Sequence, residues 1–232
     1  MGKFRKLFGI EEDAVKKTCI FLPLATKEIL DSLNVKKMVR GKIYGSGQGR
    51  DFTVIHTGMG PTWTGDAVLY LVQTACENII LFGACGSTGM LSVGTLVMAT
   101  LCYEQETFSK LLGLAHETWP TFYPDRQLME TLDKKRKLKR AACLTVTSLK
   151  LQQERLMDFK KRAIDVVDME CSAFFAASRF IKRRAAALLF ITDIIGQKPF
   201  YEPLNSADKK SLSLAIKEGT RLICDFINLK QE

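Results

Sequence analysis

Apolar and polar positions alternate in blocks along the chain, and the blocks predict strands and helices in turn. Continuous apolar runs predict buried strands at 18–22, 78–82, 93–99, 141–147, 163–167 and 185–191. Helical spacing predicts helices at 26–33, 62–76, 127–139, 151–161, 170–180 and 207–229. Strands that are apolar on both faces and alternate with helices are typical of parallel sheets covered on both sides. We therefore predict an α/β fold with a mixed, mostly parallel twisted sheet flanked by helices.

Two stretches depart from this alternation. Short strands at 42–44 and 52–56 predict a hairpin across the glycine-rich residues 45–49, because glycine supplies the positive φ that such turns need. Residues 103–126 show no regular period and contain Trp119-Pro120 and Tyr123-Pro124. We expect this irregular stretch to form a loop over the site or a subunit contact.

The length and composition indicate a single folded domain. The chain has 232 residues, of which 47% are hydrophobic, so it can bury a large core. It contains no internal repeat and no linker-like segment. We predict a lead-in at residues 1–17, which are polar, and one α/β domain at residues 18–232.

The net charge of +9 comes largely from two basic runs, at 134–140 and 182–184. Such runs are usually solvated helix ends, and they lack interleaved aromatic residues, so we expect no nucleic-acid partner. No apolar run approaches the roughly 18 to 20 residues that span a bilayer, and the N-terminus lacks the core of a signal peptide. These features predict a cytoplasmic protein without a membrane partner.

The cysteines and histidines do not follow a metal-binding spacing. Seven cysteines are scattered through mostly apolar segments without a CxxC pair, and the chain has two histidines. We interpret the cysteines as reduced core residues and expect no disulfide framework and no metal.

Acidic residues follow two of the predicted strands. Asp168-Met169-Glu170 ends one apolar run, and Thr192-Asp193 ends the next. A carboxylate against an apolar core needs a partner, and ligand sites in α/β sheets gather at the carboxyl ends of strands. Glu170 and Asp193 are therefore the leading site candidates. A second interpretation is that Asp168 or Glu170 caps a helix and Asp193 opens a turn, and the pattern alone leaves both open.

Glycine pairs follow two further strands, in Gly58-Met59-Gly60 and Gly83-Ala84-Cys85-Gly86. Glycine lets backbone N–H groups approach an anion or a sugar, although it also serves tight packing. The first pair does not complete a dinucleotide-binding GxGxxG, because Trp63 stands at the third glycine position, and no P-loop lysine follows. Both common nucleotide motifs are therefore disfavoured.

The order of these segments resembles the nucleoside phosphorylase and nucleosidase superfamily, of the purine nucleoside phosphorylase, uridine phosphorylase and methylthioadenosine/adenosylhomocysteine nucleosidase type. The resemblance covers nearly the whole chain after about residue 18. It rests on Thr57-Gly58-Met59-Gly60, Phe82-Gly83-Ala84-Cys85-Gly86, Leu91-Ser92-Val93-Gly94-Thr95-Leu96-Val97, Val167-Asp168-Met169-Glu170-Cys171-Ser172-Ala173 and Ile191-Thr192-Asp193.

The resemblance implies a role for each matching residue. Glu170 would bind the ribose hydroxyls and Met169 would pack against the sugar. Asp193 would be the general acid near the purine N7, a role that suits a carboxyl whose pKa is raised by burial. Phe200 and Tyr201 follow Asp193 closely and are candidates to cover the base. The backbone at three glycines would shape the sugar and nucleophile pockets: Gly58, Gly83 and Gly86.

The phosphate site is where the chain departs from the family. Arg40 matches an arginine that reaches a neighbouring subunit's phosphate, which implies a homo-oligomer, either a dimer or a trimer of dimers. The family's phosphate loop after the first strand is replaced by Pro23-Leu24-Ala25-Thr26-Lys27-Glu28, and two further family residues are replaced by Leu81 and Ala84. Losing an arginine fork should weaken phosphate binding.

Three functions remain open. The leading hypothesis is phosphorolysis of the N-glycosidic bond of a nucleoside, purine favoured, with phosphate held by Arg40, Lys27 and backbone amides and with no cofactor. The first alternative is hydrolysis of the same bond with Glu28 activating water, although the nucleosidase arginine four residues before the acid is Leu189 here. The second alternative is a catalytically weak nucleoside-binding protein.

Overall fold

The computed structural model describes residues 2–105, 108–114, 119–134 and 137–229. The first part of the chain forms α1 (Lys3–Phe8), η1 (Glu12–Ala14), β1 (Thr18–Leu22), α2 (Lys27–Ser32), β2 (Met38–Arg40), β3 (Gly45–Gln48), β4 (Thr53–His56), α3 (Pro61–Leu69), η2 (Tyr70–Gln73), β5 (Asn78–Ser87) and β6 (Leu96–Glu104). The rest forms α4 (Phe108–Leu111), β7 (Thr121–Phe122), α5 (Arg126–Asp133), β8 (Lys139–Thr145), α6 (Leu149–Gln152), α7 (Leu156–Lys161), β9 (Val166–Asp168), α8 (Cys171–Phe180), β10 (Arg184–Ile194) and α9 (Ser206–Leu229).

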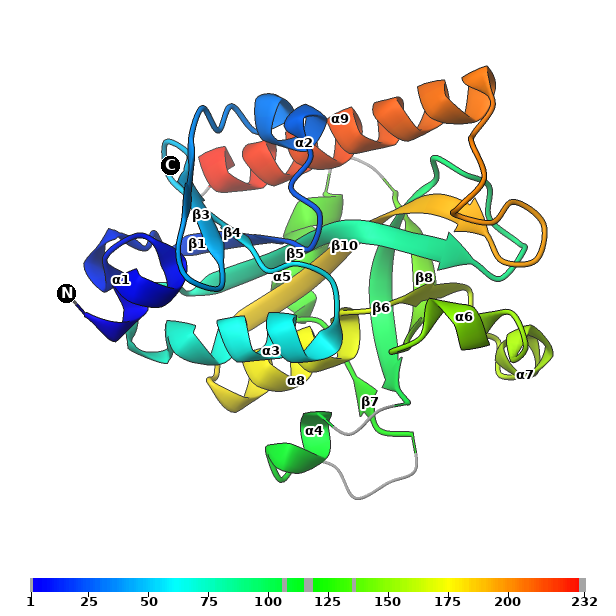
Figure 1. The fold of residues 1–232 in the computed structure, drawn as a ribbon, viewed down its shortest axis with the longest axis horizontal. Coiled ribbons are helices and arrows are strands. Elements are labelled where there is room, and N and C mark those ends of the chain that lie inside the picture. Colours follow the sequence, from blue (N-terminus) through cyan, green and yellow to red (C-terminus); the bar gives the residue numbers. More distant parts are fainter. Residues whose placement is uncertain (1, 106–107, 115–118, 135–136, 230–232) are drawn as a thin grey trace.

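One twisted sheet runs through the molecule (Figure 1). Its order is β10-β6-β8-β9-β5-β1-β4-β3-β2, with β7 beside β6 and a further pairing between β10 and β5. The strands β4, β1, β5 and β10 pair in parallel, as do β6, β8 and β9. The contacts of β9 with β5 and of β10 with β6 are antiparallel and close part of the sheet on itself. The carboxyl ends of β1, β5 and β10 therefore meet on one side of the molecule.

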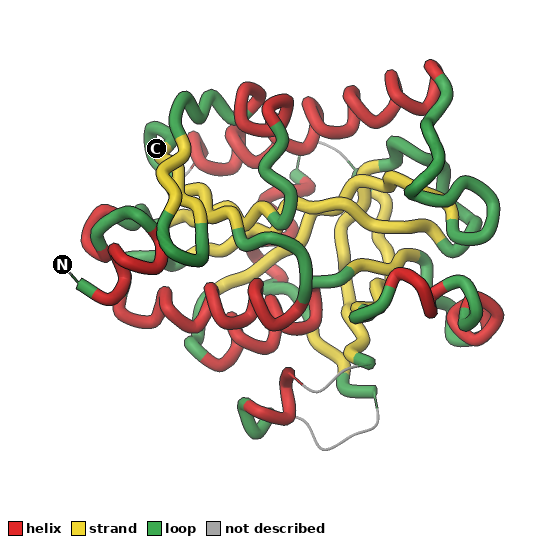
Figure 2. Tube along the Cα trace, viewed as in Figure 1, coloured by secondary structure: helices red, strands yellow, loops and turns green. Residues whose placement is uncertain are grey.

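Helices cover both faces of the sheet, as Figure 2 shows in red against yellow strands. On one face α9 contacts α2 and α5, and on the other α8 contacts α3 and α4. Helix α9 can lie close to β5 because a Cβ at Gly219 would come within 2.5 Å of the Phe82 ring. Across the described residues, no helix is both long enough and apolar enough to cross a bilayer. This arrangement confirms the predicted α/β class.

The first 17 residues, predicted as a polar lead-in, include two core aromatic residues. Phe4 and Phe8 of α1 are buried, and the Phe8 ring stacks on Tyr44 with 4.6 Å between the ring centroids. Phe4 and Phe8 are spaced four residues apart, so a short helix places both on one face. Helix α1 therefore packs on the same core as the strands that follow it.

Three predicted boundaries were wrong for related reasons. The glycine-rich residues 45–48 form strand β3 itself, paired antiparallel with β4, and not the turn of a hairpin. The glycine segment after residue 82 is the second half of β5, because its backbone pairs with β10 up to Ser87. The strand expected at 93–99 begins at Leu96 and continues to Glu104 inside the irregular stretch. In each case backbone pairing with a neighbouring strand overrode the local preference of glycine or polar residues.

Three predicted helices are shorter than their apolar pattern, and one of them, expected at 127–139, ends at Asp133. The helix expected at 62–76 ends as an α-helix at Leu69 and continues as a 3-10 turn, and the one expected at 151–161 is divided into α6 and α7. The irregular stretch contains α4 and β7, while residues 106–107 and 115–118 lie outside the described part. Helix boundaries depend on caps and tertiary contacts that a periodic pattern does not specify.

Candidate active site

A cavity of about 260 Å³ opens at the carboxyl ends of the parallel strands. Segments after β1 and β4, the second half of β5, the ends of β9 and β10, and helix α6 all contribute to its wall. The lining residues are Pro23, Leu24, Met59, Ala84, Cys85, Gly86, Leu149, Gln152, Val167, Asp168, Met169, Glu170, Thr192, Asp193 and Phe200. The cavity wall therefore contains three carboxylates among residues that are mostly apolar.

Glu170 lies at the N-terminus of α8, with only 4% of its surface exposed. The backbone N–H of Gly60 donates to its Oε1 at 2.7 Å. Burial and the charge of Asp168 raise the pKa of Glu170 to about 8, against the opposing effect of hydrogen bonds from the Gly60 and Met169 backbone. The side chain is thus held in place at one oxygen.

Asp168 has a structural role at the same turn. Its Oδ2 accepts from the backbone N–H of Glu170 and Cys171, at 3.0 and 2.7 Å, and its Oδ1 accepts from the Thr145 hydroxyl at 2.7 Å. Of the two sequence interpretations, helix capping therefore describes Asp168, whereas Glu170 makes no side-chain cap bond. Asp168 fixes the start of α8 and with it the position of Glu170.

Asp193 comes from β10, at an irregularity where the register with β5 shifts between Ile191 and Asp193. The Thr192 hydroxyl donates to Oδ1 of Asp193 at 2.8 Å. A Cβ on Gly86 would lie 2.9 Å from Oδ2, so glycine at this position leaves room for the carboxyl. Burial raises the pKa of Asp193, partly offset by the Thr192 hydrogen bond. A carboxyl in this environment holds its proton to higher pH than usual, as a general acid requires.

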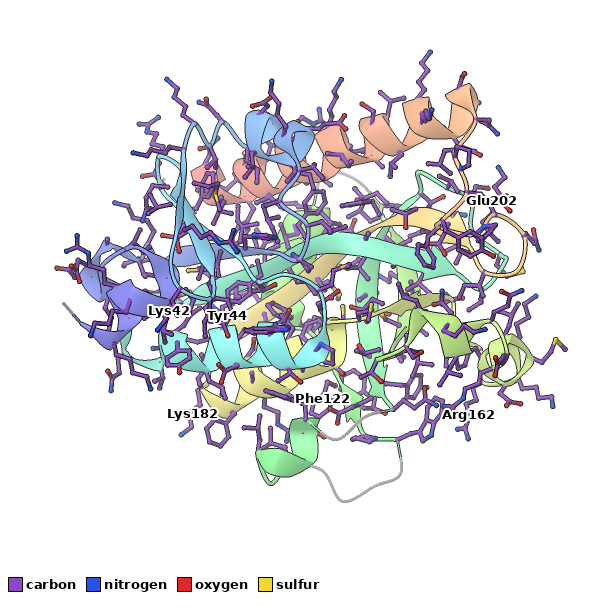
Figure 3. All side chains as sticks on the ribbon, in the orientation of Figure 1. Lys42, Tyr44, Phe122, Arg162, Lys182 and Glu202 are labelled. Carbon is purple, nitrogen blue, oxygen red and sulfur yellow. The ribbon has the colours of Figure 1, made fainter. Side chains whose placement is uncertain are left out.

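The predicted cationic residues lie outside the cavity wall. Lys27 and Arg40 are both exposed, and neither lines the cavity. Among the described lining residues none is lysine, arginine or histidine. The basic residues labelled in Figure 3, Lys42, Arg162 and Lys182, are all exposed. The positive charge of this protein is therefore mainly on its surface.

Glu28, the predicted base for hydrolysis, also lies outside the cavity wall. It sits in the first turn of α2, and its Oε1 accepts a hydrogen bond of 2.5 Å from the hydroxyl of Ser213 on α9. The structure thus engages Glu28 in the contact between these two helices.

Of the three predicted glycines, one lines the cavity and two lie next to residues that line it. Gly86 lines the cavity, while Gly58 and Gly83 do not, although their neighbours Met59 and Ala84 do. Gly58 has a φ of 76°, a conformation that a residue with a Cβ adopts at a cost. These glycines therefore set the backbone path around the site.

The structure adds residues that the sequence did not single out. Leu149 and Gln152 line the cavity, and both belong to the short helix α6. No local sequence motif marks these two residues. The bond from Gly60 to Glu170 joins residues 110 positions apart, although the glycine pair itself was noted. Phe200 lines the cavity, as suggested for a residue covering the base, whereas Tyr201 is outside the wall.

Comparison with known proteins shows the family and the fold of this chain. A sequence model of the family described as the phosphorylase superfamily matches residues 11–228. Among curated proteins, no sequence matches this chain. A uridine phosphorylase from Vibrio fischeri is similar in structure with a TM-score of 0.75 at 20% identity, covering 93% of this chain and 94% of that chain.

Nucleosidases have a similar fold. The 5′-methylthioadenosine/S-adenosylhomocysteine nucleosidase of Neisseria meningitidis, solved with methylthio-immucillin-A, has a TM-score of 0.72 at 15% identity, covering 91% of this chain and 98% of that chain. The corresponding enzyme of Campylobacter jejuni has a TM-score of 0.70 at 12% identity, with the same coverage. At these identities the structural likeness shows the fold.

Proposed function

Since the chain belongs to the phosphorylase superfamily, we propose that it cleaves the N-glycosidic bond of a nucleoside, purine favoured, by phosphorolysis. The observation that carries this proposal is the placement of Glu170 and Asp193 in the wall of one cavity. One carboxyl is needed near the sugar and one near the base, and both are buried here.

Asp193 acts as the general acid in the proposed reaction. Its protonated carboxyl donates a proton to N7 of the purine while the electron pair of the glycosidic bond moves to the base. The base leaves as a neutral molecule and an oxocarbenium-like sugar develops. General acid catalysis of this kind contributes about 100- to 10,000-fold to a rate. The raised pKa of Asp193 supports this role.

Glu170 binds the ribose hydroxyls in the same proposal. The Gly60 N–H holds one of its oxygens, and Met169 beside it lines the cavity, where it packs against the sugar. The bound hydroxyls fix the sugar relative to Asp193, so that proton transfer and bond cleavage occur in one geometry.

Phosphate is the proposed nucleophile, with no other cofactor. Because Arg40 and Lys27 are exposed and outside the cavity of their own chain, we infer that Arg40 supplies charge to the cavity of a neighbouring copy. The working unit is then a homo-oligomer. The reaction would serve nucleoside catabolism and salvage in the cytoplasm, and the mostly buried thiols suit a reducing compartment.

Hydrolysis of the same bond is the second candidate, and one observation favours it. The described cavity wall carries three carboxylates and no cationic side chain, which suits a neutral nucleophile better than a phosphate dianion. Glu28 would have to leave Ser213 to activate water there. A nucleoside-binding protein without turnover is the third candidate, and the apolar Leu81, Ala84 and Leu189 support it.

The deciding experiment measures release of free base from purine and pyrimidine nucleosides, with and without phosphate, by chromatography. Release that requires phosphate and yields a sugar phosphate supports phosphorolysis. Equal release in both buffers, with free sugar as product, would replace it by hydrolysis. Binding in calorimetry without release of any base would replace both by the binding function.

A further inference from the structure

Behind the cavity, the sheet carries a buried cluster of sulfur and oxygen ligands. Cys102, Cys143 and Asp168 are all buried, and one ligand atom from each lies within 4.8 Å of the others. The sequence placed the cysteines far apart without a metal-binding spacing. The register of the parallel strands brings them together, because Cys102 on β6 is the direct partner of Cys143 on β8.

A further cysteine, Cys171 at the start of α8, lies beside this cluster. The thiol of Cys171 lies near those of Cys102 and Cys143. Its backbone N–H is the one that donates to Oδ2 of Asp168 at 2.7 Å. Two thiols and one carboxylate oxygen therefore surround a common point between the sheet and the start of α8, with the Cys171 thiol beside the two sulfurs.

We propose that Cys102, Cys143 and Asp168 form a binding site for a thiophilic divalent cation such as Zn²⁺, with Cys171 as the fourth ligand. Three sulfurs and one oxygen make a tetrahedral ligand set of the kind that zinc prefers. The cysteines of this site do not line the nucleoside cavity, and Asp168 is the residue that the two sites share.

The distances suit such an ion. The Cys143 thiol donates to Oδ1 of Asp168 across 3.5 Å. Zinc bonds of about 2.3 Å to sulfur and about 2.1 Å to oxygen at a tetrahedral angle separate the two ligands by about 3.6 Å. The ion would therefore take the place of the shared proton without moving these two atoms far apart. In this arrangement Oδ1 of Asp168 binds the ion, while Oδ2 keeps its hydrogen bonds from the backbone at the start of α8.

The charge balance supports a cation at this point. Among the described residues, no lysine, arginine or histidine forms an ion pair with Asp168 or Glu170. Buried charges are normally paired or bound to metal. Asp168 also lines the cavity, which gives an ion a path from solvent to the cluster. Binding replaces the thiol protons by metal–sulfur bonds, and these protons pass to solvent.

The test uses the full chain, reduced and treated with chelator, and titrated with Co²⁺ near neutral pH. We expect a cobalt–thiolate charge-transfer band that saturates at one ion per chain and is bleached when Zn²⁺ displaces Co²⁺. Cys102→Ser and Cys143→Ser should each lose most of the band. Cys224→Ser is the matched control, because this cysteine lies on α9 away from the cluster, and it should keep the band.

A second measurement on the unaltered protein does not depend on the folding of a variant. In weak buffer with an indicator dye, Zn²⁺ should release at least two protons per bound ion, since thiols lose their protons on coordination. No cobalt–thiolate band, a band unchanged in both cluster variants, or binding without proton release would each overturn the proposal. None of these readouts uses nucleoside turnover, so they stay separate from the test of the proposed function.

Discussion

The backbone N–H of Gly60 donates to Oε1 of Glu170 at 2.7 Å and so joins the loop after β4 to the start of α8. Gly60 has a φ of 117° and a ψ of 150°, a combination that is nearly restricted to glycine. Space is not the constraint, since an added Cβ would meet its nearest atom, in Trp63, only at 3.9 Å. The positive φ alone therefore ties this hydrogen bond to glycine.

We predict that Gly60→Ala raises the KM for the nucleoside about tenfold or more, because the strained residue moves its N–H away from Glu170. Strain of this type costs about 1–3 kcal/mol. Gly113→Ala is the control, because Gly113 also has a positive φ, of 67°, with open space around it. Steady-state kinetics and thermal unfolding of both variants separate the effects. Equal KM changes in the two variants would contradict the role of the Gly60 bond.

Asp193→Asn should lower kcat about 100- to 10,000-fold, because an amide cannot donate a proton to the leaving base. The change keeps the size of the side chain and an oxygen that can accept from Thr192. Asp31→Asn, at an exposed acidic position, serves as the control. Turnover of the best nucleoside measures the effect. Normal kcat in Asp193→Asn would remove Asp193 from the mechanism.

The same variant should change how stability depends on pH. Burial raises the folded-state pKa of Asp193 above its unfolded value of about 3.9. The protonated carboxyl therefore contributes stability below the unfolded pKa, and this contribution is lost as pH rises through the folded pKa. Asparagine never carries the charge. We expect Asp193→Asn to gain stability relative to the wild type as pH rises from 4 to 8, measured by urea unfolding, and a gain toward acid pH would refute this account.

Arg40 provides a test of the proposed oligomer. If it holds phosphate in a neighbouring copy, Arg40→Ala should raise the KM for phosphate about tenfold or more, with a smaller effect on kcat. Mixing Arg40→Ala with Asp193→Asn under conditions of subunit exchange should restore part of the activity. One site in each mixed pair then combines Asp193 of one chain with Arg40 of the other.

Lys37→Ala is the matched control, since Lys37 is an exposed basic residue just before β2. Lys37→Ala should leave the KM for phosphate unchanged. A mixture of Lys37→Ala with Arg40→Ala should have no more activity than the two variants have separately. If mixing Arg40→Ala with Asp193→Asn gives no more activity at low phosphate than the sum of the two separate variants, Arg40 does not act between subunits.

The hydrophobic pattern correctly predicted elements whose apolar residues repeat with the period of their own secondary structure. Residues 18–22, the long closing helix and the helix ending at Phe180 were predicted nearly as observed. These segments are apolar with the period of their own structure, so local sequence and burial agree. Residues 45–48 and 83–87 were misassigned because their strands consist largely of small or polar residues, and pairing with neighbours decides their conformation.

The same limit applies to the site. The acidic strand ends and the glycine pairs pointed to Glu170, Asp193 and Gly86, and the family resemblance added Met169. All four line the cavity, because the carboxyl ends of parallel strands meet at one edge of the sheet. The contributions of Leu149 and Gln152 carry no local signature. Their positions depend on how α6 returns over the sheet, which a one-dimensional pattern does not contain.

The sequence by itself determined the fold class and the buried runs of the sheet, and it marked Glu170 and Asp193 as acidic residues at strand ends, since these follow from periodic burial and from where strands end. Only the tertiary structure decided which acidic residue caps α8, how Gly60 reaches Glu170, and that Cys102 and Cys143 stand side by side. These relationships join residues that are distant along the chain. They depend on strand register and backbone geometry, which the pairing of the whole sheet fixes and no single segment encodes.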